Sequence, residues 1–103
     1  MFIYDPASNT WTGGIDLPAA RAEAISAVVD DKIYLIGGRV RATDDARLFN
    51  DHIDSVRNEV FDPTIDRWAT LADAPTARNS AAAAVIDGKI YVVGGGSQFC
   101  QEC

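Results

Sequence analysis

A direct internal repeat constrains this chain more than any other feature of its sequence. When residues 2–38 are aligned with residues 59–95 without a gap, 16 of 37 positions are identical. At this offset of 57 residues, Trp11 falls on Trp68. A period of this size indicates a repeat architecture, in which each unit buries its apolar face against its neighbours. The chain is therefore two copies of one unit, separated by the unmatched stretch 39–58.

Short apolar runs within each unit predict β-strands. The segments 24–30 and 81–87 are small and β-branched residues that end in Asp-Asp and Asp-Gly, which are hairpin signals. The runs 32–36 and 89–93 follow, are rich in β-branched and aromatic residues, and stop at Gly-Gly. Helical propensity alone would also allow helices in the Ala-rich parts. A helix there would have to end in a hairpin turn, so we predict strands.

The second half of the unit adds two more strands, 59–61 and 67–71. Asp62-Pro63 lies between them and marks a turn, because proline cannot donate a hydrogen bond to a strand ladder. The complete unit is then strand, tight turn, strand, Gly-Gly, long loop, strand, Asp-Pro turn and strand. This order predicts an all-β fold built from four-stranded antiparallel meanders.

These residues resemble the kelch repeat. An Ala-Arg pair precedes an Ala-rich strand, then Asp-Gly-Lys-Ile-Tyr-Val-Val-Gly-Gly, Glu-Val-Phe-Asp-Pro, a spaced Trp and Ala-Pro, and the match covers nearly all of 2–95. The resemblance implies kelch-type β-propeller blades of about 50 residues each. We expect Trp11, Trp68, Tyr34 and Tyr91 to fill the space between blades, because aromatic rings bury large apolar areas.

The resemblance also assigns each segment of the chain to a propeller blade. Residues 1–14 correspond to the outer two strands of a first blade, and 22–71 to one complete blade with the long loop 39–57. Residues 78–95 correspond to the inner two strands of a next blade, and 96–103 to a terminal tail. Propellers have about 4–8 blades, so the ring is incomplete. Two arrangements stay open: a fragment of a longer propeller, or a homo-oligomer whose copies complete each other's blades.

For function, the resemblance implies a non-enzymatic protein-interaction scaffold that binds a partner at one mouth of the propeller. In adaptor-type kelch propellers, an arginine at the start of the innermost strand often contacts acidic partner residues. Arg21 and Arg78 match that position, and Asn79 extends the match beside Arg78. Arginine suits this role because its planar fork grips carboxylates. The alternative is that each arginine bonds the backbone of a neighbouring blade.

The loop 39–57 is the second candidate binding region, because loops on rigid scaffolds commonly carry binding residues. The candidate side chains are those of Arg39, Arg41, Asp51 and His52. Its alternative role is a solvated insertion. The expected ligand of both regions is a protein partner with acidic residues. A purely structural segment, whose partners are only neighbouring blades, is a further possibility.

A carbohydrate-active propeller of the sialic-acid mutarotase type, with a sugar ligand, is the alternative function. That chemistry needs an acid and a base that converge, and nothing in the sequence places such a pair, so we assign no catalytic residue. His52 is the only histidine, whereas a galactose-oxidase-like copper site needs two. Cys100 and Cys103 have half of a zinc-knuckle spacing and are expected to be free thiols or to lack a disulfide partner. No metal or cofactor is predicted.

Charge and hydropathy exclude two classes of partner. The formal net charge is −6 and the pI is about 4.4, which argues against binding to nucleic acid or to an anionic membrane. No apolar run approaches the roughly 18 residues of a membrane span. Residues 1–12 lack the basic and apolar regions of a signal peptide, so a cytoplasmic location is the default expectation.

Overall fold

A computed structural model describes residues 1–41 and 52–96 of the chain. These residues form strands and no helix, so the prediction of an all-β fold is confirmed. The part of the chain that is described thus contains no helix long and apolar enough to cross a membrane. The strands are β1 (Phe2–Asp5), β2 (Thr10–Gly13), β3 (Ile25–Val29), β4 (Lys32–Ile36), β5 (Arg39–Arg41), β6 (His52–Asp54), β7 (Asn58–Asp62), β8 (Arg67–Thr70), β9 (Ala82–Ile86) and β10 (Lys89–Val93).

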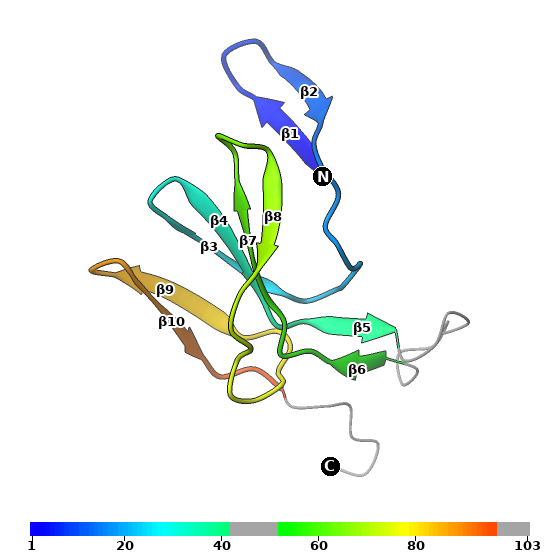
Figure 1. The fold of residues 1–103 in the computed structure, drawn as a ribbon, viewed down its shortest axis with the longest axis vertical. Helices are drawn as coiled ribbons and strands as arrows, with labels where there is room; N and C mark the ends of the chain where they lie inside the picture. Colours follow the sequence, from blue (N-terminus) through cyan, green and yellow to red (C-terminus); the bar gives the residue numbers. More distant parts are fainter. Residues whose placement is uncertain (42–51, 97–103) are drawn as a thin grey trace.

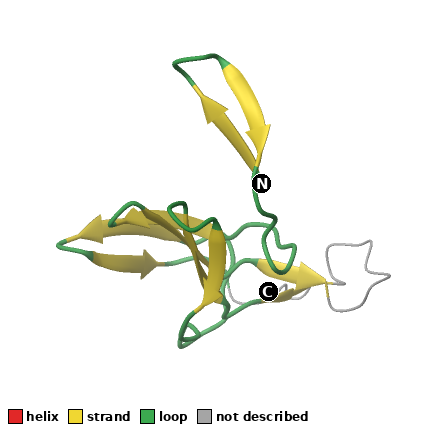
Figure 2. Ribbon diagram, turned by 45° about the horizontal axis from the view of Figure 1, so that its top comes forward, coloured by secondary structure: helices red, strands yellow, loops and turns green. Residues whose placement is uncertain are grey.

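The largest sheet is a four-stranded antiparallel meander in the order β3-β4-β7-β8 (Figure 1). This is the arrangement that the sequence predicts for the repeat unit. The hairpins β1–β2, β5–β6 and β9–β10 form separate two-stranded sheets. The β9–β10 hairpin lies beside β3, whereas β1–β2 stands away from the other strands in both views (Figure 1 and Figure 2).

The two copies of the repeat have the same local geometry. Tyr4 faces Trp11 in β1–β2 as Phe61 faces Trp68 in β7–β8. The ring centroids are 5.0 Å and 5.2 Å apart, and both pairs are tilted by 44°. The hairpins β3–β4 and β9–β10 also share one register. The surroundings differ, however, since Phe61 is 3% exposed and Tyr4 is 42% exposed.

The backbone conformation of the two hairpin turns explains why Asp-Asp and Asp-Gly occur there. Asp30 and Asp31 have φ of 50° and 62°, and their repeat equivalents Asp87 and Gly88 have φ of 51° and 73°. Two successive residues with positive φ are typical of a type I′ turn, whose twist matches that of the flanking strands. Aspartate tolerates this conformation better than most residues, so Asp31 takes the place that glycine occupies in the second copy.

The Gly-Gly pair at the end of β4 joins the two repeats. Gly37 and Gly38 have φ of 70° and 93°. The amide of Gly38 donates a hydrogen bond of 3.0 Å to the carbonyl oxygen of Arg78. A Cβ on Gly37 would lie 2.7 Å from that same carbonyl oxygen, which is too close for any side chain. Glycine is therefore required where the backbone of the second repeat approaches the first.

The ends of the long connection between β4 and β7 form a β-ribbon that the sequence pattern does not predict. Strand β5 pairs antiparallel with β6, and the ribbon projects away from the meander (Figure 1). Each strand has only three residues, of which one is apolar, so both are too short to give the apolar alternation by which strands are found in a sequence. Residues 42–51, between the two strands, lie outside the described residues.

The centre of the meander contains an ion cluster as well as apolar side chains. Glu59 and Phe61 lie on the same face of β7, because alternate residues of a strand share a face, and Glu59 is 0% exposed. The Glu59 carboxylate forms ion pairs with the guanidinium groups of Arg21 and Arg57, the latter over 2.9 Å. A buried carboxylate is tolerated only with such partners. The cluster ties the residue that precedes β3 to strand β7.

The substitution Glu59→Gln is predicted to destabilise the fold by about 3–5 kcal/mol, because it leaves the buried Arg21 charge without its counter-ion. Urea unfolding followed by circular dichroism measures the loss. The control is Lys32→Gln, since Lys32 pairs with Asp62 over 4.0 Å but is 44% exposed, so that its removal leaves no buried charge and should cost much less. Equal losses of stability in the two variants would contradict the role of Glu59 as the counter-ion of the buried Arg21.

The substitution Thr64→Ala is predicted to raise the pKa of Asp62. Both the hydroxyl and the backbone N–H of Thr64 donate to Asp62 Oδ1, over 2.6 Å and 2.9 Å, and these bonds hold the pKa of Asp62 below its usual value, the hydroxyl bond contributing most. The equivalent turn in the first repeat has Ala7 at this position, so the substitution converts one turn into the other. Carboxyl NMR titration measures the change.

The lowered pKa of Asp62 also determines how the free energy of unfolding depends on pH. A carboxyl whose pKa is lowered by folding stabilises the folded state above its unfolded pKa, and that stabilisation is lost as the pH falls through the folded pKa. The stability difference between the parent chain and Thr64→Ala should therefore be largest near neutral pH and smaller in acid. A difference that grows on acidification argues against the Thr64 bonds as its cause.

Candidate functional site

A hollow of about 610 Å³ opens beside the β5–β6 ribbon, and we call it the cationic hollow. Its described lining consists of Ala19, Ala20, Arg21, Ala22, Arg39, Val40, Arg41, His52 and Arg57. Four of these residues are arginines, and within the described residues no carboxylate is among them. The hollow is therefore a concentration of positive charge on a chain whose formal net charge is −6.

The β5–β6 ribbon positions two of these side chains. Arg41 lies directly opposite His52, and Arg39 lies opposite Asp54. Residues opposite each other in an antiparallel pair project from the same face, and so do alternate residues along a strand. Arg39, Arg41, His52 and Asp54 consequently share one face of the ribbon. Pairing of the two strands brings together residues that stand far apart in the sequence.

Arg39 is held in place by carboxylates behind the hollow. Its Nε lies 2.9 Å from Glu23 Oε2 and 4.0 Å from Asp54 Oδ1, and the residue is buried. Asn79 is buried too, and its Nδ2 donates a hydrogen bond of 2.7 Å to Asp54 Oδ1. Asp54 therefore links Arg39, in the connection between the two repeats, to Asn79 in the second repeat.

Arg21 lies at the floor of the cationic hollow and is almost completely buried. Its Nη1 donates to the carbonyl oxygen of Gly37 over 3.2 Å and to that of Arg57 over 3.5 Å. Burial lowers the pKa of the Arg21 guanidinium, and the nearby Arg57 charge lowers it further. The group stays charged at neutral pH, because the pKa of arginine begins above 12. The Arg21 guanidinium therefore contacts residues of the meander and its connections, which are Gly37, Arg57 and Glu59.

Arg57 lines the cationic hollow and is the last residue of the predicted loop 39–57, although it was not singled out among the candidate side chains of that loop. Its Nε donates to Glu59 Oε1, while more than a third of the side chain is exposed. One sequence signal could have identified it. Glu59 alternates with the aromatic Phe61 on the inward face of a strand, so a buried carboxylate, and hence a nearby cation, is required.

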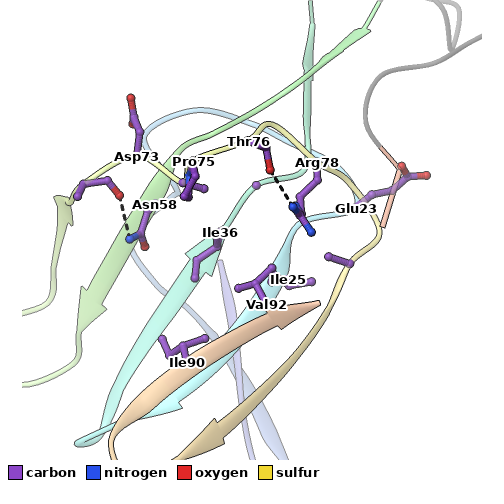
Figure 3. A pocket seen from close by; sticks show the side chains of 14 residues that line it. Glu23, Ile25, Ile36, Asn58, Asp73, Pro75, Thr76, Arg78, Ile90 and Val92 are labelled. Atoms are coloured by element: carbon purple, nitrogen blue, oxygen red, sulfur yellow. Dashed lines mark hydrogen bonds between the residues drawn. The ribbon is translucent and has the colours of Figure 1, made fainter. Parts of the chain in front are cut away.

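A second hollow, of about 460 Å³, lies between β3–β4 and β9–β10, and we call it the apolar hollow (Figure 3). The connection from β8 to β9 closes it on one side, with Pro75 and Thr76 among the lining residues. Its polar lining includes Glu23, Asn58 and Asp73. Its large aliphatic side chains are Ile25, Ile36, Ile90 and Val92.

Arg78 lines the apolar hollow and not the cationic hollow. Its Nη1 donates to the carbonyl oxygen of Gly94 over 2.8 Å. Its Nη2 donates to Thr76 Oγ1 over 2.8 Å, the bond drawn in Figure 3. The bond to Gly94 is the repeat equivalent of the bond from Arg21 to Gly37. The two arginines therefore occupy the same position in their repeats, but they lie in different hollows.

The predicted binding residues are thus only partly brought together. Arg21, Arg39, Arg41 and His52 line the cationic hollow, Arg78 lines the apolar hollow, and Asn79 is buried behind Arg39. Asp51, Cys100 and Cys103 lie outside the described residues. In the described ranges 1–41 and 52–96, no group of three or more His, Cys, Asp and Glu side chains is arranged to hold a metal ion.

Comparison with known proteins relates the whole chain to one family. Two family models described as the kelch motif match residues 20–75 and 77–102. The chain is 39% identical over 94 residues to the kelch-like protein terF of Aspergillus terreus, covering 89% of the chain. It is 34% identical over 92 residues to the kelch-like protein 35 of Mus musculus, again covering 89% of the chain. The chain spans only 19% and 14% of the length of these relatives.

A solved structure extends the comparison to the fold. The structure of YjhT matches with a TM-score of 0.74 and 26% identity, over 86% of this chain and 25% of that chain. This likeness confirms the prediction of kelch-type propeller strands, and the described strands do not close a ring. A kelch-motif model covers more than half of the chain, residues 20–75. The chain therefore belongs to the kelch-repeat family.

Proposed function

We propose that the chain is part of a protein-interaction module that binds an acidic segment of a partner protein at the cationic hollow. The observation that carries the proposal is the lining of that hollow, which brings four arginines and His52 together. Residues 22–71 would form one blade, with 1–14 and 78–95 contributing halves of its neighbours. The kelch-repeat resemblance supports a binding role, because it implies that loops at one mouth contact a partner.

The arginines around the cationic hollow favour an anionic ligand, and nearby carboxylates offset part of the positive charge. Glu23, Asp54 and Glu59 neutralise part of the arginine charge from behind. Arg41 is exposed at the edge of the site, and Arg57 is partly exposed. Positive side chains gathered in a concave surface focus the electrostatic field and attract anions. Planar guanidinium groups also bind carboxylates with two parallel hydrogen bonds, which lysine does not do.

Within this proposal the arginines have different roles. Arg41 and Arg57 contact the acidic segment, since their side chains reach solvent. Arg21 and Arg39 are positioning residues, because both are buried against carboxylates. His52 lies opposite Arg41 and supports the same face of the ribbon.

The proposal predicts that a fluorescein-labelled hexaglutamate peptide binds the 103-residue chain. Arg41→Glu should weaken this binding at least about tenfold, because it places like charges together. The matched control is Arg67→Glu on β8, an exposed arginine outside the cationic hollow, which should change the affinity by less than about twofold. Raising NaCl from about 50 mM to about 300 mM should weaken binding as well. Fluorescence anisotropy measures all three.

Two outcomes would count against this function. If hexalysine binds as tightly as hexaglutamate, the interaction is not recognition of an acidic group. If Arg67→Glu weakens binding as much as Arg41→Glu, the effect comes from net charge and not from the cationic hollow. Absence of any binding would instead favour a segment whose only partners are neighbouring blades.

A carbohydrate-active module is the second candidate. The observation that favours it is the apolar hollow, which has two carboxyl side chains, Glu23 and Asp73, in its lining. Opening of a sugar ring needs an acid and a base at one site. If this candidate is correct, sialic acid added to the chain should shift the NMR signals of Glu23 and Asp73, and Asp73→Asn should abolish the shifts. Unchanged spectra at millimolar sugar would exclude it.

A further inference from the structure

The second repeat reaches the β5–β6 ribbon through one buried side chain, that of Asn79. We propose that Asn79 is a positioning residue for the cationic hollow: its amide holds the ribbon, and with it Arg41, in the orientation that binds an acidic segment. Asn79 is not part of the lining of the hollow, so it acts through its partner Asp54. This inference rests on the proposed function of the cationic hollow.

A β-bulge joins the ribbon to the meander. Two residues, Gly37 and Gly38, connect β4 to β5, whereas three residues, 55–57, connect β6 to β7 on the opposite strand. Backbone hydrogen bonds cross between these two connections. An extra residue on one strand bends that strand and redirects the residues beyond it, and both glycines have positive φ. The direction of the ribbon therefore depends on contacts at its base.

Two consecutive residues of the second repeat make such contacts. The carbonyl oxygen of Arg78 accepts a hydrogen bond from the amide of Gly38 over 3.0 Å. The Nδ2 of Asn79 donates to Oδ1 of Asp54, the last residue of β6, over 2.7 Å. The first contact uses only backbone atoms. The second depends on which residue stands at position 79.

Comparison of the two repeats shows that the backbone of the repeat does not require asparagine there. The equivalent of Asn79 at the offset of 57 residues is Ala22. Ala22 forms an isolated β-bridge with Arg39, and Asn79 forms the equivalent bridge with Gly96. Alanine has no polar group in its side chain, yet the bridge forms. The amide of Asn79 is thus an addition to the common pattern, and its partner lies in the ribbon.

The bond between Asn79 and Asp54 is enclosed by the protein. Asn79 is 7% exposed, and the side chain of Asp54 is 4% exposed. The other carboxylate oxygen of Asp54, Oδ2, is buried and has no hydrogen-bond partner within 1–41 and 52–96. A buried carboxylate depends strongly on each donor that it has. Loss of the Asn79 amide should therefore displace Asp54 toward water.

Displacement of Asp54 would change the face of the ribbon that lines the cationic hollow. Asp54 shares this face with Arg41 and His52, and each strand of the ribbon has only three residues. A tilt at the base consequently moves Arg41 and His52 together. It moves them relative to Arg57, which lies beside β7 and also lines the hollow. The positive groups would then no longer converge on one ligand.

The test begins with Asn79→Asp, which places a second carboxylate against that of Asp54. Because two like charges at this distance repel, affinity for fluorescein-labelled hexaglutamate should fall at least about tenfold, as measured by fluorescence anisotropy. In NMR spectra the backbone amide signals of Arg41 and His52 should also move, although the substitution lies in the second repeat and both residues lie in the ribbon.

An exchange of the two residues should reverse these effects. Asp54→Asn combined with Asn79→Asp restores the hydrogen bond, with donor and acceptor reversed, and the formal net charge of −6. Affinity should return to within about threefold of that of the parent chain, because the two positions act as one pair. The amide signals of Arg41 and His52 should return toward their parent positions.

The matched control combines Asn79→Asp with Asp30→Asn. Asp30 is exposed in the turn between β3 and β4, and asparagine tolerates its positive φ. This variant has the same net charge as the exchange variant, but the two carboxylates at positions 54 and 79 still face each other. Its affinity should therefore stay as low as that of Asn79→Asp alone.

Failure of the proposed function is distinguishable from failure of this inference. If the parent chain does not bind hexaglutamate, the acidic ligand is wrong, and the NMR signals of Arg41 and His52 still decide whether Asn79 orients the ribbon. The exchange variant keeps the hydrogen bond, so the test stands even if Asn79→Asp alone does not fold.

Three results would overturn the role of Asn79. The first is an Asn79→Asp chain whose affinity, or whose Arg41 and His52 signals, match those of the parent chain. The second is an exchange variant that recovers neither. The third is recovery by Asp30→Asn as complete as that by Asp54→Asn, since the effect would then come from net charge.

Discussion

The buried carboxylate of Glu59 is the interaction on which the rest of the structure depends. It lies on the inward face of β7 between Arg21 and Arg57. Through Arg21, which also binds the carbonyl of Gly37, it connects the segment before β3, the end of β4 and the start of β7. Through Arg57 it reaches the surface of the cationic hollow. One charged group thus holds the meander together and orients part of the candidate site.

Similar local sequences give equivalent hairpins in the two repeats, and different neighbours give these hairpins different surroundings. Arg21 and Arg78 bind equivalent carbonyl groups in their repeats. Arg21 is enclosed because β7 pairs with β4, whereas Arg78 stays at the side of a hollow. The resemblance to adaptor-type propellers assigns both arginines to the same position of the repeat, with Arg78-Asn79 as the closer match. In this chain the strand that lies alongside, and not the arginine itself, decides whether the guanidinium group is enclosed.

The strands and turns were predictable from the sequence because their signals are local and occur twice. Asp30-Asp31 and Asp87-Gly88 specify hairpins, and Asp62-Pro63 specifies the next turn. The β5–β6 ribbon was not predictable, because its short charged strands depend on pairing across residues 42–51. The separation of Arg78 from Arg39 was not predictable either. It arises from the packing of β9 beside β3, which no local pattern encodes.

The β5–β6 ribbon also bears on the order in which the chain folds. Pairing of β4 with β7 must close a long connection, and closure of a long flexible loop carries an entropic cost that grows with its length. The ribbon brings the two ends of this connection together, and the amide of Ser55 then donates to the carbonyl of Gly38 over 2.8 Å. A ribbon that forms early turns a distant strand pairing into a nearly local one. The arginines that it carries are then in place before the meander is complete.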